Sequence, residues 1–331
     1  MSMKSTLLLH HLKVENANAI SGLTYGFPAI SHFLGFTHAL SRRLARDYGL
    51  TLGGCAVIAH QVDVHSHPVG GRGEQVFALT RNPLTHEGNT APFNEEGRMH
   101  LDISLLIECH FNADDLPSGS GQDGDSLDLR IATLHQWFAR TIPTLRVAGG
   151  TLLAIGKVQW REAYDEAALF RLRMSLLPGF ALVCRHDLLS KHHQQRLVAE
   201  PDGELLDSLL DFVTLRHRAQ RDEKEEVSWQ RVAKPESGYL VPLAVGYQEI
   251  SPIHDPGSVP SSRDQETPFR FVESIYTLGQ WVSPHRIDDL DALLWRYRYQ
   301  EPYYLCENRY QASELDEDDS DTESVLASDL F

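Results

Sequence analysis

The sequence predicts an α+β fold built on a ferredoxin-like, or RRM-like, β-α-β-β-α-β core over residues 5–155. Apolar runs and segments of helical periodicity follow one another in that order. The chain has 331 residues, 42% hydrophobic and 23% charged, which is typical of a globular protein with one large or two modest domains. We expect residues 1–155 to form this domain, with an inserted thumb-like loop or hairpin at about residues 65–98. Residues 156–310 would form a further helical and strand region packing on it, and residues 311–331 an acidic disordered tail.

The first strand and helix are predicted by a change of period. The apolar run Leu7–Val14 reads as a strand, and Pro28–Tyr48 reads as a helix. Proline suits the first helical position because its missing N–H needs no partner there. The helix carries one apolar face, and Gly49 is well placed to end it.

The next two strands enclose a long irregular stretch. Leu52–Val64 is rich in small and β-branched residues, and Met99–His110 alternates cleanly between apolar and polar positions, so both predict strands. Between them we expect a turn at Ser66–Gly73, a short strand at Gln75–Leu79 and a long loop at Thr80–Gly97. An irregular loop of this length usually indicates a function or a partner contact.

The rest of the chain reads as alternating helices and strands. The core would close with a flexible loop at Asp114–Asp125, a helix from Leu127 to Ile142 and a strand within Arg146–Gly156. Helices are then predicted at Glu162–Leu177 and Leu205–His217, strands at Phe180–Arg185 and Tyr239–Gly246, a charged linker at Gln220–Ser228 and a loop at Ser251–Pro268. Pro242 makes the Tyr239 strand an edge strand. Ser283 and Pro284 would open a last helix with Ile287, Leu290, Leu294 and Tyr297 on one face, whereas Phe269–Trp281 could be helix or strand.

The net charge of −16 disfavours a nucleic-acid ligand at first sight. Half of that excess lies in the last 18 residues, which contain eight acidic residues and no basic one. Among the basic residues 24 are arginine and 6 are lysine, and arginine is the side chain suited to bidentate phosphate and base contacts. A local arginine-lined groove therefore remains compatible with the composition.

Motifs for catalysis, metals and membranes are not found. The four cysteines show no CxxC pairing and read as reduced core thiols. The pairs His10-His11, His65-x-His67 and His192-His193 have no third ligand at a metal-site spacing, so we expect neither a metal nor a cofactor. HExxH, GxSxG, Walker and Rossmann patterns are also missing. The chain has no run of about 20 apolar residues and no signal-peptide pattern, so we expect no membrane contact and a cytoplasmic location.

The loop that precedes the first helix is the leading candidate for a binding site. Asn16–Gly22 is a turn of small and polar residues, and Tyr25-Gly26-Phe27-Pro28 then leads into a helix that ends in arginines. This unit could hold an anionic polymer or be a plain strand–helix unit. Arg81-Asn82 offers the two side chains best suited to reading base edges, and further arginines recur on loops containing glycine or proline. Aromatic residues are interleaved with them and could stack on unpaired bases, although core packing is the plainer explanation.

Several dispersed strings resemble one known family. They are NANAIS, TYGFP, GFTHAL-x-RR, LTRNPL, EEGRMHLDISLL, AGG, LLPGFALV-x-R, YLVP, RDQETPFRFVE and LGQWVSPHRI, in this order between about residues 5 and 300. They resemble the Csy two family, the Cas-five-type subunit of the type I-F CRISPR surveillance (Csy, or Cascade) complex. The resemblance is weak over 112–145 and 187–237, and it does not reach the tail.

The resemblance implies a non-catalytic RNA-binding protein. With the large subunit of the complex, such a protein caps the 5′ handle of the CRISPR RNA and abuts the first backbone subunit, and the assembled complex binds target double-stranded DNA in antiviral defence. Transferred to the matching positions, the implied RNA-binding residues are Asn16, Asn18, Ser21, Gly26, Phe27, Arg42, Arg43, Arg81, Asn82, Arg98, Arg263, Arg270, His285 and Arg286.

Two alternatives stay open. The chain could be a metal-independent repeat-RNA endonuclease of the same superfamily, with His38, Tyr25 or His285 recruited for acid–base catalysis. It could also be a protein-only interaction module whose arginines form surface ion pairs.

Overall fold

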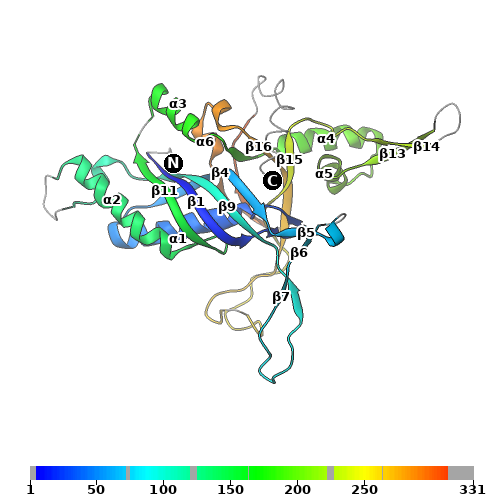
Figure 1. Cartoon of the computed structure of the whole chain (residues 1–331), viewed down its shortest axis with the longest axis horizontal. Helices are drawn as coiled ribbons and strands as arrows, with labels where there is room; N and C mark the ends of the chain where they lie inside the picture. The colour runs from blue at the N-terminus through cyan, green and yellow to red at the C-terminus, as the bar shows by residue number, and fades with distance from the viewer. Residues whose placement is uncertain are drawn as a thin grey trace.

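A mixed α+β fold with one large antiparallel sheet is seen in the computed structural model, which describes residues 5–71, 75–119, 125–162, 164–221, 227–262 and 264–311. Within these residues ten strands form the sheet in the order β10-β11-β1-β9-β4-β12-β16-β15-β18-β17. Figure 1 shows the strands running through the whole body of the molecule. The acidic tail and Arg263 lie outside the described residues.

The first half of the chain supplies one side of this sheet. The main elements are β1 (Ser5–Asn18), α1 (Ile30–Tyr48), β4 (Leu52–Val64), β9 (Arg98–Cys109), α2 (Leu127–Thr141), β10 (Arg146–Val147) and β11 (Gly150–Arg161). The predicted strands and helices of this half are confirmed, although β1 and β11 are longer than expected. Helix α1 begins at Ile30, two residues after Pro28, and ends at Gly49 with the left-handed backbone (φ 73°) that glycine adopts without strain.

The two faces of the sheet bury different helices. Leu7 and Leu9 of β1 pack in one cluster with residues of α1 and α2, whereas Leu8 packs in a second cluster with residues of α3 (Glu166–Ser175) and α6 (Leu290–Leu293). Successive side chains of a strand point to opposite faces, so α1 and α2 cover one face and α3 and α6 the other. Figure 1 shows α3 and α6 above the sheet and α1 beneath it.

The second half of the chain continues the same sheet. Its strands are β12 (Phe180–Cys184), β15 (Tyr239–Glu249), β16 (Val272–Val282), β17 (Arg296–Gln300) and β18 (Tyr303–Glu307). The segment Phe269–Trp281, which the sequence left open between helix and strand, thus forms most of β16. Pro242 lies beyond the stretch Gly246–Gln248 that pairs with β18, so β15 is locally an edge there, as predicted.

The predicted last helix from Ser283 to Tyr297 is wrong. The chain forms a 3₁₀ turn η4 (Pro284–Arg286), the single turn α6 and then β17. Trp295 decides this arrangement: its backbone N–H donates to Cys55 O (2.9 Å) and its indole donates to Leu182 O (2.8 Å), with the ring fully buried. The apolar spacing that suggested a helical face reflects a chain crossing the end of the sheet.

Two projections leave the sheet. Residues 65–98 form β5 (Ser66–Pro68), η1 (Val69–Gly71), β6 (Gln75–Phe77), β7 (Leu79–Arg81) and β8 (Phe93–Glu95), so much of the expected loop is a pair of hairpins. The second projection carries α4 (His186–Ala199), α5 (Leu205–Val213), β13 (His217–Arg221) and β14 (Val227–Arg231). The sequence did not predict α4, and the expected linker Gln220–Ser228 is the outer end of this hairpin, with 222–226 outside the described residues. Figure 1 shows the projection that contains β7 and the projection that contains β13 and β14 pointing in different directions.

The remaining elements are short. They are β2 (Ile20–Ser21), β3 (Thr24–Tyr25), η2 (Ala113–Asp115) and η3 (Ile142–Thr144). All four cysteines are free thiols, three of them buried, as predicted, and burial raises the pKa of Cys55 and Cys306 to about 12. Among the described helices, none combines the length and apolar content needed to cross a bilayer.

Candidate nucleic-acid interface

The loop at the end of β1 is shaped by its asparagines. β1 shifts register between Val14 and Ala17, and Asn16 there has positive φ (54°), while its N–H donates to His100 Nδ1 at 3.3 Å. The Asn18 amide donates to Ile20 O (2.6 Å) and its Oδ1 accepts from Ile20 N–H (3.2 Å). Asn18 therefore closes the turn, whereas the exposed Asn16 side chain is available to a ligand.

The hairpin β2–β3 docks this loop on the sheet. Leu23 N–H donates to the Tyr276 hydroxyl of β16 (2.6 Å), and Gly26 N–H donates to Ala19 O (2.9 Å). Gly26 has φ 111°, which only glycine adopts readily, although a β-carbon at this position would meet open space. The backbone conformation, and not lack of room, thus requires glycine before α1.

Phe27 has a different environment from the one expected for a stacking residue. Its half-buried ring packs against Phe33 (5.6 Å between centroids) and edge-on against Trp281 (4.9 Å). The ring joins the loop to the core, so it can form a wall of a binding site but is not a free platform for a base.

A cavity of about 450 Å³ lies directly beside this loop. It is lined by Ser21, the segment Thr24–Pro28, residues Val241–Ala244 of β15, and Ser66 and Gln75 of the inserted hairpin. Ser21 is 6% exposed, and its hydroxyl has no hydrogen-bond partner. A buried hydroxyl without a partner costs free energy, so Ser21 is a candidate for a hydrogen bond that forms only when a ligand binds.

Arg98 is the charged group nearest to this loop in the strand register. It opens β9 opposite Asn18, and its guanidinium donates to Glu96 Oε2 through two nitrogens (3.1 and 3.0 Å). Its carbonyl accepts from His65 N–H (2.9 Å), so Arg98 also joins the base of the inserted hairpins to the loop.

The hairpin β7–β8 of the insertion carries the remaining predicted pair. Arg81 lies in β7 opposite Phe93, and its side chain is outside the described part of the structure. The Asn82 amide donates to Pro92 O at 3.4 Å across the hairpin. Figure 1 shows β7 extending well beyond the sheet.

The other predicted residues do not join this loop. Arg42 and Arg43 lie about 18 Å along α1 from its first residue, at a rise of about 1.5 Å per residue, and Arg43 donates to the Thr144 hydroxyl. Arg270 forms an ion pair with Glu249, which also accepts from the Tyr299 hydroxyl (3.0 Å).

His285 and Arg286 lie in η4, which packs against α3 on the opposite face. The structure therefore brings together Asn16, Asn18, Ser21, Gly26, Phe27 and Arg98, and leaves Arg42, Arg43, His285 and Arg286 apart.

Comparison with known proteins identifies the family. The profile of the family described as CRISPR-associated protein (Cas_Csy2) matches residues 7–306. A protein named CRISPR-associated protein Csy2, from Pseudomonas aeruginosa (strain UCBPP-PA14), is 38% identical over 322 residues, covering 90% of this chain and 93% of that protein. The chain belongs to the Cas_Csy2 family. The resemblance to the Csy subunit of type I-F CRISPR systems is thereby confirmed.

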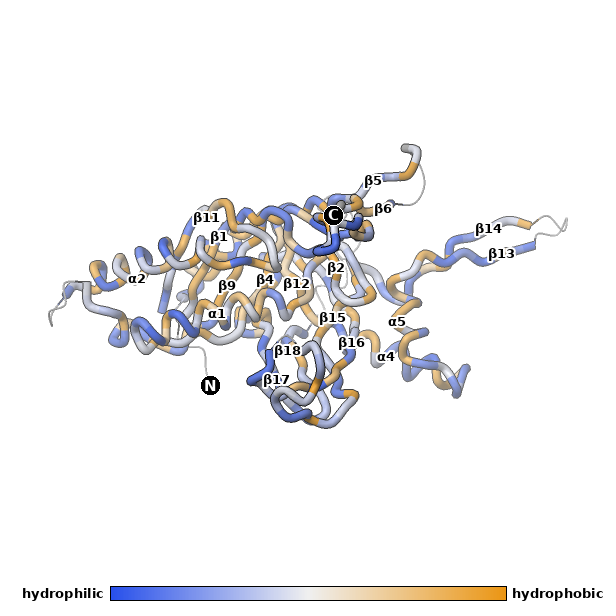
Figure 2. The backbone as a smooth tube through the Cα atoms, turned by 90° about the horizontal axis from the view of Figure 1, so that it is seen from below, coloured by the Kyte–Doolittle hydropathy of each residue, from blue (hydrophilic) through white to orange (hydrophobic). Residues whose placement is uncertain are grey.

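Sequence reasoning missed a second basic surface of this Csy2-family chain. Every residue of β13 and β14 is exposed, including Arg218, Arg221 and Arg231, and Trp229 beside them is 69% exposed. Figure 2 shows this largely hydrophilic hairpin projecting beyond α4 and α5. The signal in the sequence was the series of arginines on both sides of an acidic run, which a charged linker explained equally well.

The residues named for an endonuclease do not form a catalytic group in the Csy2-family chain. His38 is exposed on α1, Tyr25 contacts Phe77 beside the loop (5.4 Å), and His285 lies on the opposite face, where its Nδ1 is 2.6 Å from Ser283 Oγ. Acid–base catalysis needs the two groups within hydrogen-bond reach of one substrate. His285 cannot act together with His38 or Tyr25 in that way, because it lies on the other face of the sheet.

Proposed function

We propose that this Csy2-family chain is a non-catalytic subunit that binds and caps the 5′ handle of the CRISPR RNA together with the large subunit. The observation that carries the proposal is the cavity of about 450 Å³ beside the Asn16–Pro28 loop, which is lined by Ser21 and Thr24–Pro28, while Arg98 is opposite Asn18 in the strands that lead into the loop. An apolar-walled cavity with polar and guanidinium groups on the adjoining strands suits a splayed, single-stranded nucleotide.

The topology supports an RRM-like body under this site. The order β11-β1-β9-β4, connected through α1 and α2 on one face, is the order of a ferredoxin-like core. In this proposal residues 1–155 form that body, residues 65–98 act as a thumb-like element that closes over the RNA, and residues 156–310 extend the same sheet.

The partners follow from the proposed role. As a Csy2-family member the chain assembles with other Cas subunits, among which we propose the large subunit and the first backbone subunit as direct neighbours. Target double-stranded DNA would be bound by the assembled complex through guide pairing, with the proteins holding backbone and shape. The same role places the chain in the cytoplasm.

Arg98 beside the loop and Arg81 on the inserted hairpin provide the first test. We expect the double variant Arg81→Ala, Arg98→Ala to weaken handle binding by the assembled complex by about 10-fold or more, and to reduce the salt dependence of binding, because phosphate contacts release counterions. Fluorescence anisotropy with a labelled handle RNA at two salt concentrations measures both quantities.

Arg298→Ala is the matched control, because Arg298 is an exposed arginine of β17 paired with Glu307 at 3.0 Å. Equal affinity of the double variant and wild type, with no crosslink between RNA and this chain, would support the protein-only module. A discrete product from repeat RNA in EDTA, abolished by a single histidine substitution, would establish the endonuclease.

A substitution at Ser21 tests RNA binding separately from folding. Ser21→Ala removes a hydroxyl without a partner, so the free energy of unfolding should stay within about 0.5 kcal/mol or rise slightly, while handle affinity falls several-fold. Ser41→Ala is the opposite case, because the Ser41 hydroxyl accepts from Leu52 N–H (2.9 Å) in the core. It should lower the free energy of unfolding by about 1–2 kcal/mol and leave the affinity unchanged. Denaturant unfolding and anisotropy on both variants decide the matter, and the reverse pattern would exclude a ligand contact at Ser21.

A further inference from the structure

Two bulges bring three histidines to one face of the sheet. In β1, Leu9 is opposite Leu105 and Leu12 is opposite Ile103, so His10 and His11 together face the single residue Ser104 of β9. In β4, Ala59 is opposite Ile103 and Gln61 is opposite Asp102, which leaves His60 as the extra residue at the same level. A bulge redirects side chains, and here the bulges on both sides of β9 direct imidazoles to the face covered by α3.

The bulge in β1 is built into the surrounding structure. His11 has φ 50°, an unusual conformation for a residue other than glycine. On the neighbouring β11, a β-carbon at Gly156 would come within 3.0 Å of His10 O and 3.1 Å of His11 Cβ. Glycine at that position leaves room for the bulge, so the neighbouring strand tolerates the strained backbone of His11.

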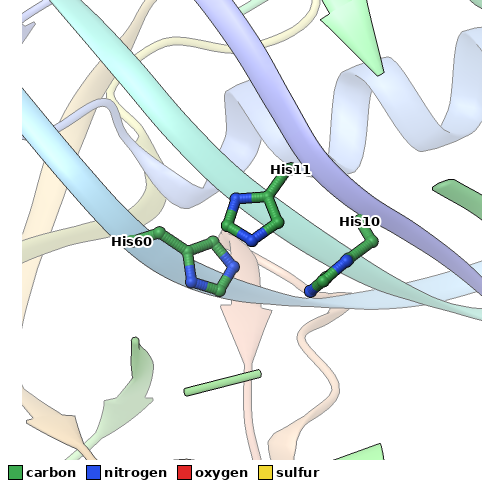
Figure 3. Close-up of side chains that lie close together, drawn as sticks. All are labelled: His10, His11 and His60. Atoms are coloured by element: carbon green, nitrogen blue, oxygen red, sulfur yellow. The ribbon is translucent and has the colours of Figure 1, made fainter. Parts of the chain in front are cut away.

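The three rings face one another across β9 (Figure 3). One ring nitrogen from each histidine belongs to a group in which all three atoms lie within 4.8 Å of one another. In a tetrahedral site with bonds of about 2.0–2.1 Å the ligand nitrogens lie about 3.4 Å apart, so small side-chain rotations bring this group to metal-binding distances.

Each imidazole has one nitrogen held by an oxygen acceptor. His10 Nε2 contacts Ser175 O (2.9 Å), His60 Nδ1 contacts Pro178 O (2.8 Å) and His11 Nδ1 contacts Asp102 Oδ1 (2.8 Å). A carbonyl or carboxylate only accepts, so each of these nitrogens carries the proton and the other nitrogen carries the lone pair. Metal-binding histidines use this outer arrangement to fix the tautomer.

Metal ligands must be deprotonated, and the contacts with the three oxygen acceptors leave one nitrogen lone pair on each ring. The other polar groups that face the cluster are Asp102, Lys157 and the Ser104 hydroxyl, which lies 2.7 Å from His60 Nε2 and would give up that contact to a metal ion.

We propose that His10, His11 and His60 bind one divalent transition-metal ion of the zinc type. Three imidazoles favour Zn²⁺ or a related ion over Mg²⁺ or Ca²⁺, which prefer oxygen ligands. The ion would connect β1 to β4 across β9, beneath the C-terminal end of α3, and would keep a fourth position for water. The sequence predicted no metal because the third ligand comes from residue 60, far from the His10-His11 pair in the chain. The site lies on the face opposite the candidate RNA cavity and is independent of the proposed function.

The test uses the untagged full chain with Zn²⁺ or Co²⁺ as the only added ligand. We expect equilibrium dialysis to show one ion per chain, and Co²⁺ to give the visible absorption bands of a four- or five-coordinate ion. His60→Gln should weaken binding by about 100-fold or more, and Asp102→Asn by about 10–100-fold, because Asp102 orients His11 without contacting the metal.

His192→Gln is the matched control, because His192 is also a half-buried histidine beside a carboxylate, 2.9 Å from Asp211, and should bind metal like wild type. Thermal unfolding in EDTA checks that each variant folds, and Asp102→Asn, which retains all three ligands, keeps the test decisive if His60→Gln does not fold. Binding below one ion per chain, a spectrum of six-coordinate Co²⁺, or equal affinities of His60→Gln and wild type would overturn the proposal.

Discussion

Replacing Arg296 by alanine is expected to lower the free energy of unfolding by about 3–5 kcal/mol. The side chain of Glu108 is 3% exposed and accepts from Arg296 Nε (2.9 Å) and Nη2 (3.0 Å) and from Gly54 N–H (3.0 Å). Without Arg296 a buried carboxylate loses its main counter-charge, and that loss is far larger than the net value of an ion pair. Arg296 also pairs with Asp291 (2.5 Å), so the variant loosens α6 as well.

The neighbouring strand position supplies the control. Arg298→Ala removes an arginine from the same strand whose partner Glu307 is exposed, so its effect should not exceed about 1 kcal/mol. Urea unfolding followed by circular dichroism measures both variants. Similar losses in the two variants would mean that the Glu108 carboxylate is hydrated in solution and that its burial has no energetic weight.

The same pair predicts a pH dependence. Burial acts to raise the pKa of Glu108, but the hydrogen bonds from Arg296 and Gly54 outweigh it and the pKa is lowered. A carboxyl group with a lowered folded-state pKa stabilises the fold above its unfolded pKa of about 4.3 and loses that contribution as the pH falls through the folded value. In Glu108→Gln this part of the acid destabilisation should be missing.

Trp281→Ala is the second change with a large expected effect. Trp281 is 2% exposed and belongs to the main core, and removal of a buried tryptophan lowers the free energy of unfolding by about 3–5 kcal/mol. Its ring also contacts Phe27, so the variant should release the Asn16–Pro28 loop and weaken handle RNA binding even under conditions where the protein stays folded.

Trp229→Ala gives the comparison, because that ring is 69% exposed on β14 and its removal should change the free energy of unfolding by less than about 0.5 kcal/mol. Chemical unfolding and RNA anisotropy at a temperature below both transitions test the pair. A destabilised Trp281→Ala variant with unchanged RNA affinity would separate the loop from the binding site.

The sequence predicted those parts of the fold whose pattern is local. The alternation in β9, the apolar face of α1 and the glycine that ends α1 each follow from a few neighbouring residues, and all are confirmed. The region around Trp295 was misread because its apolar residues are buried by β4 and β12, partners that lie more than 100 residues away in the chain. Helical spacing alone could not distinguish that arrangement from an amphipathic helix.

The residues of the candidate site also divide into those that a local pattern reveals and those whose place depends on the folded sheet. Asn16, Asn18, Ser21 and Gly26 were found together because they are close in sequence, and Arg98 joins them through the register of β1 and β9. Arg42, His285 and Arg286 were grouped with them through the family resemblance. Arg42 lies about 18 Å along α1 from its first residue, and His285 and Arg286 lie on the opposite face of the sheet. The ion pair of Arg270 with Glu249 and the approach of His60 to His10 and His11 depend on strand pairing, which no local pattern reveals.

The position of β1 in the sheet has a consequence during synthesis on the ribosome. Its neighbours are β9 and β11, whose pairing residues follow it by roughly 100 and 150 residues. At about 5–20 residues per second, the apolar run Leu7–Leu9 would wait about 5–30 s for these partners to be translated. During that time it is an unpaired, aggregation-prone strand, so we expect β1 to reach its final pairing only after β11 has been translated.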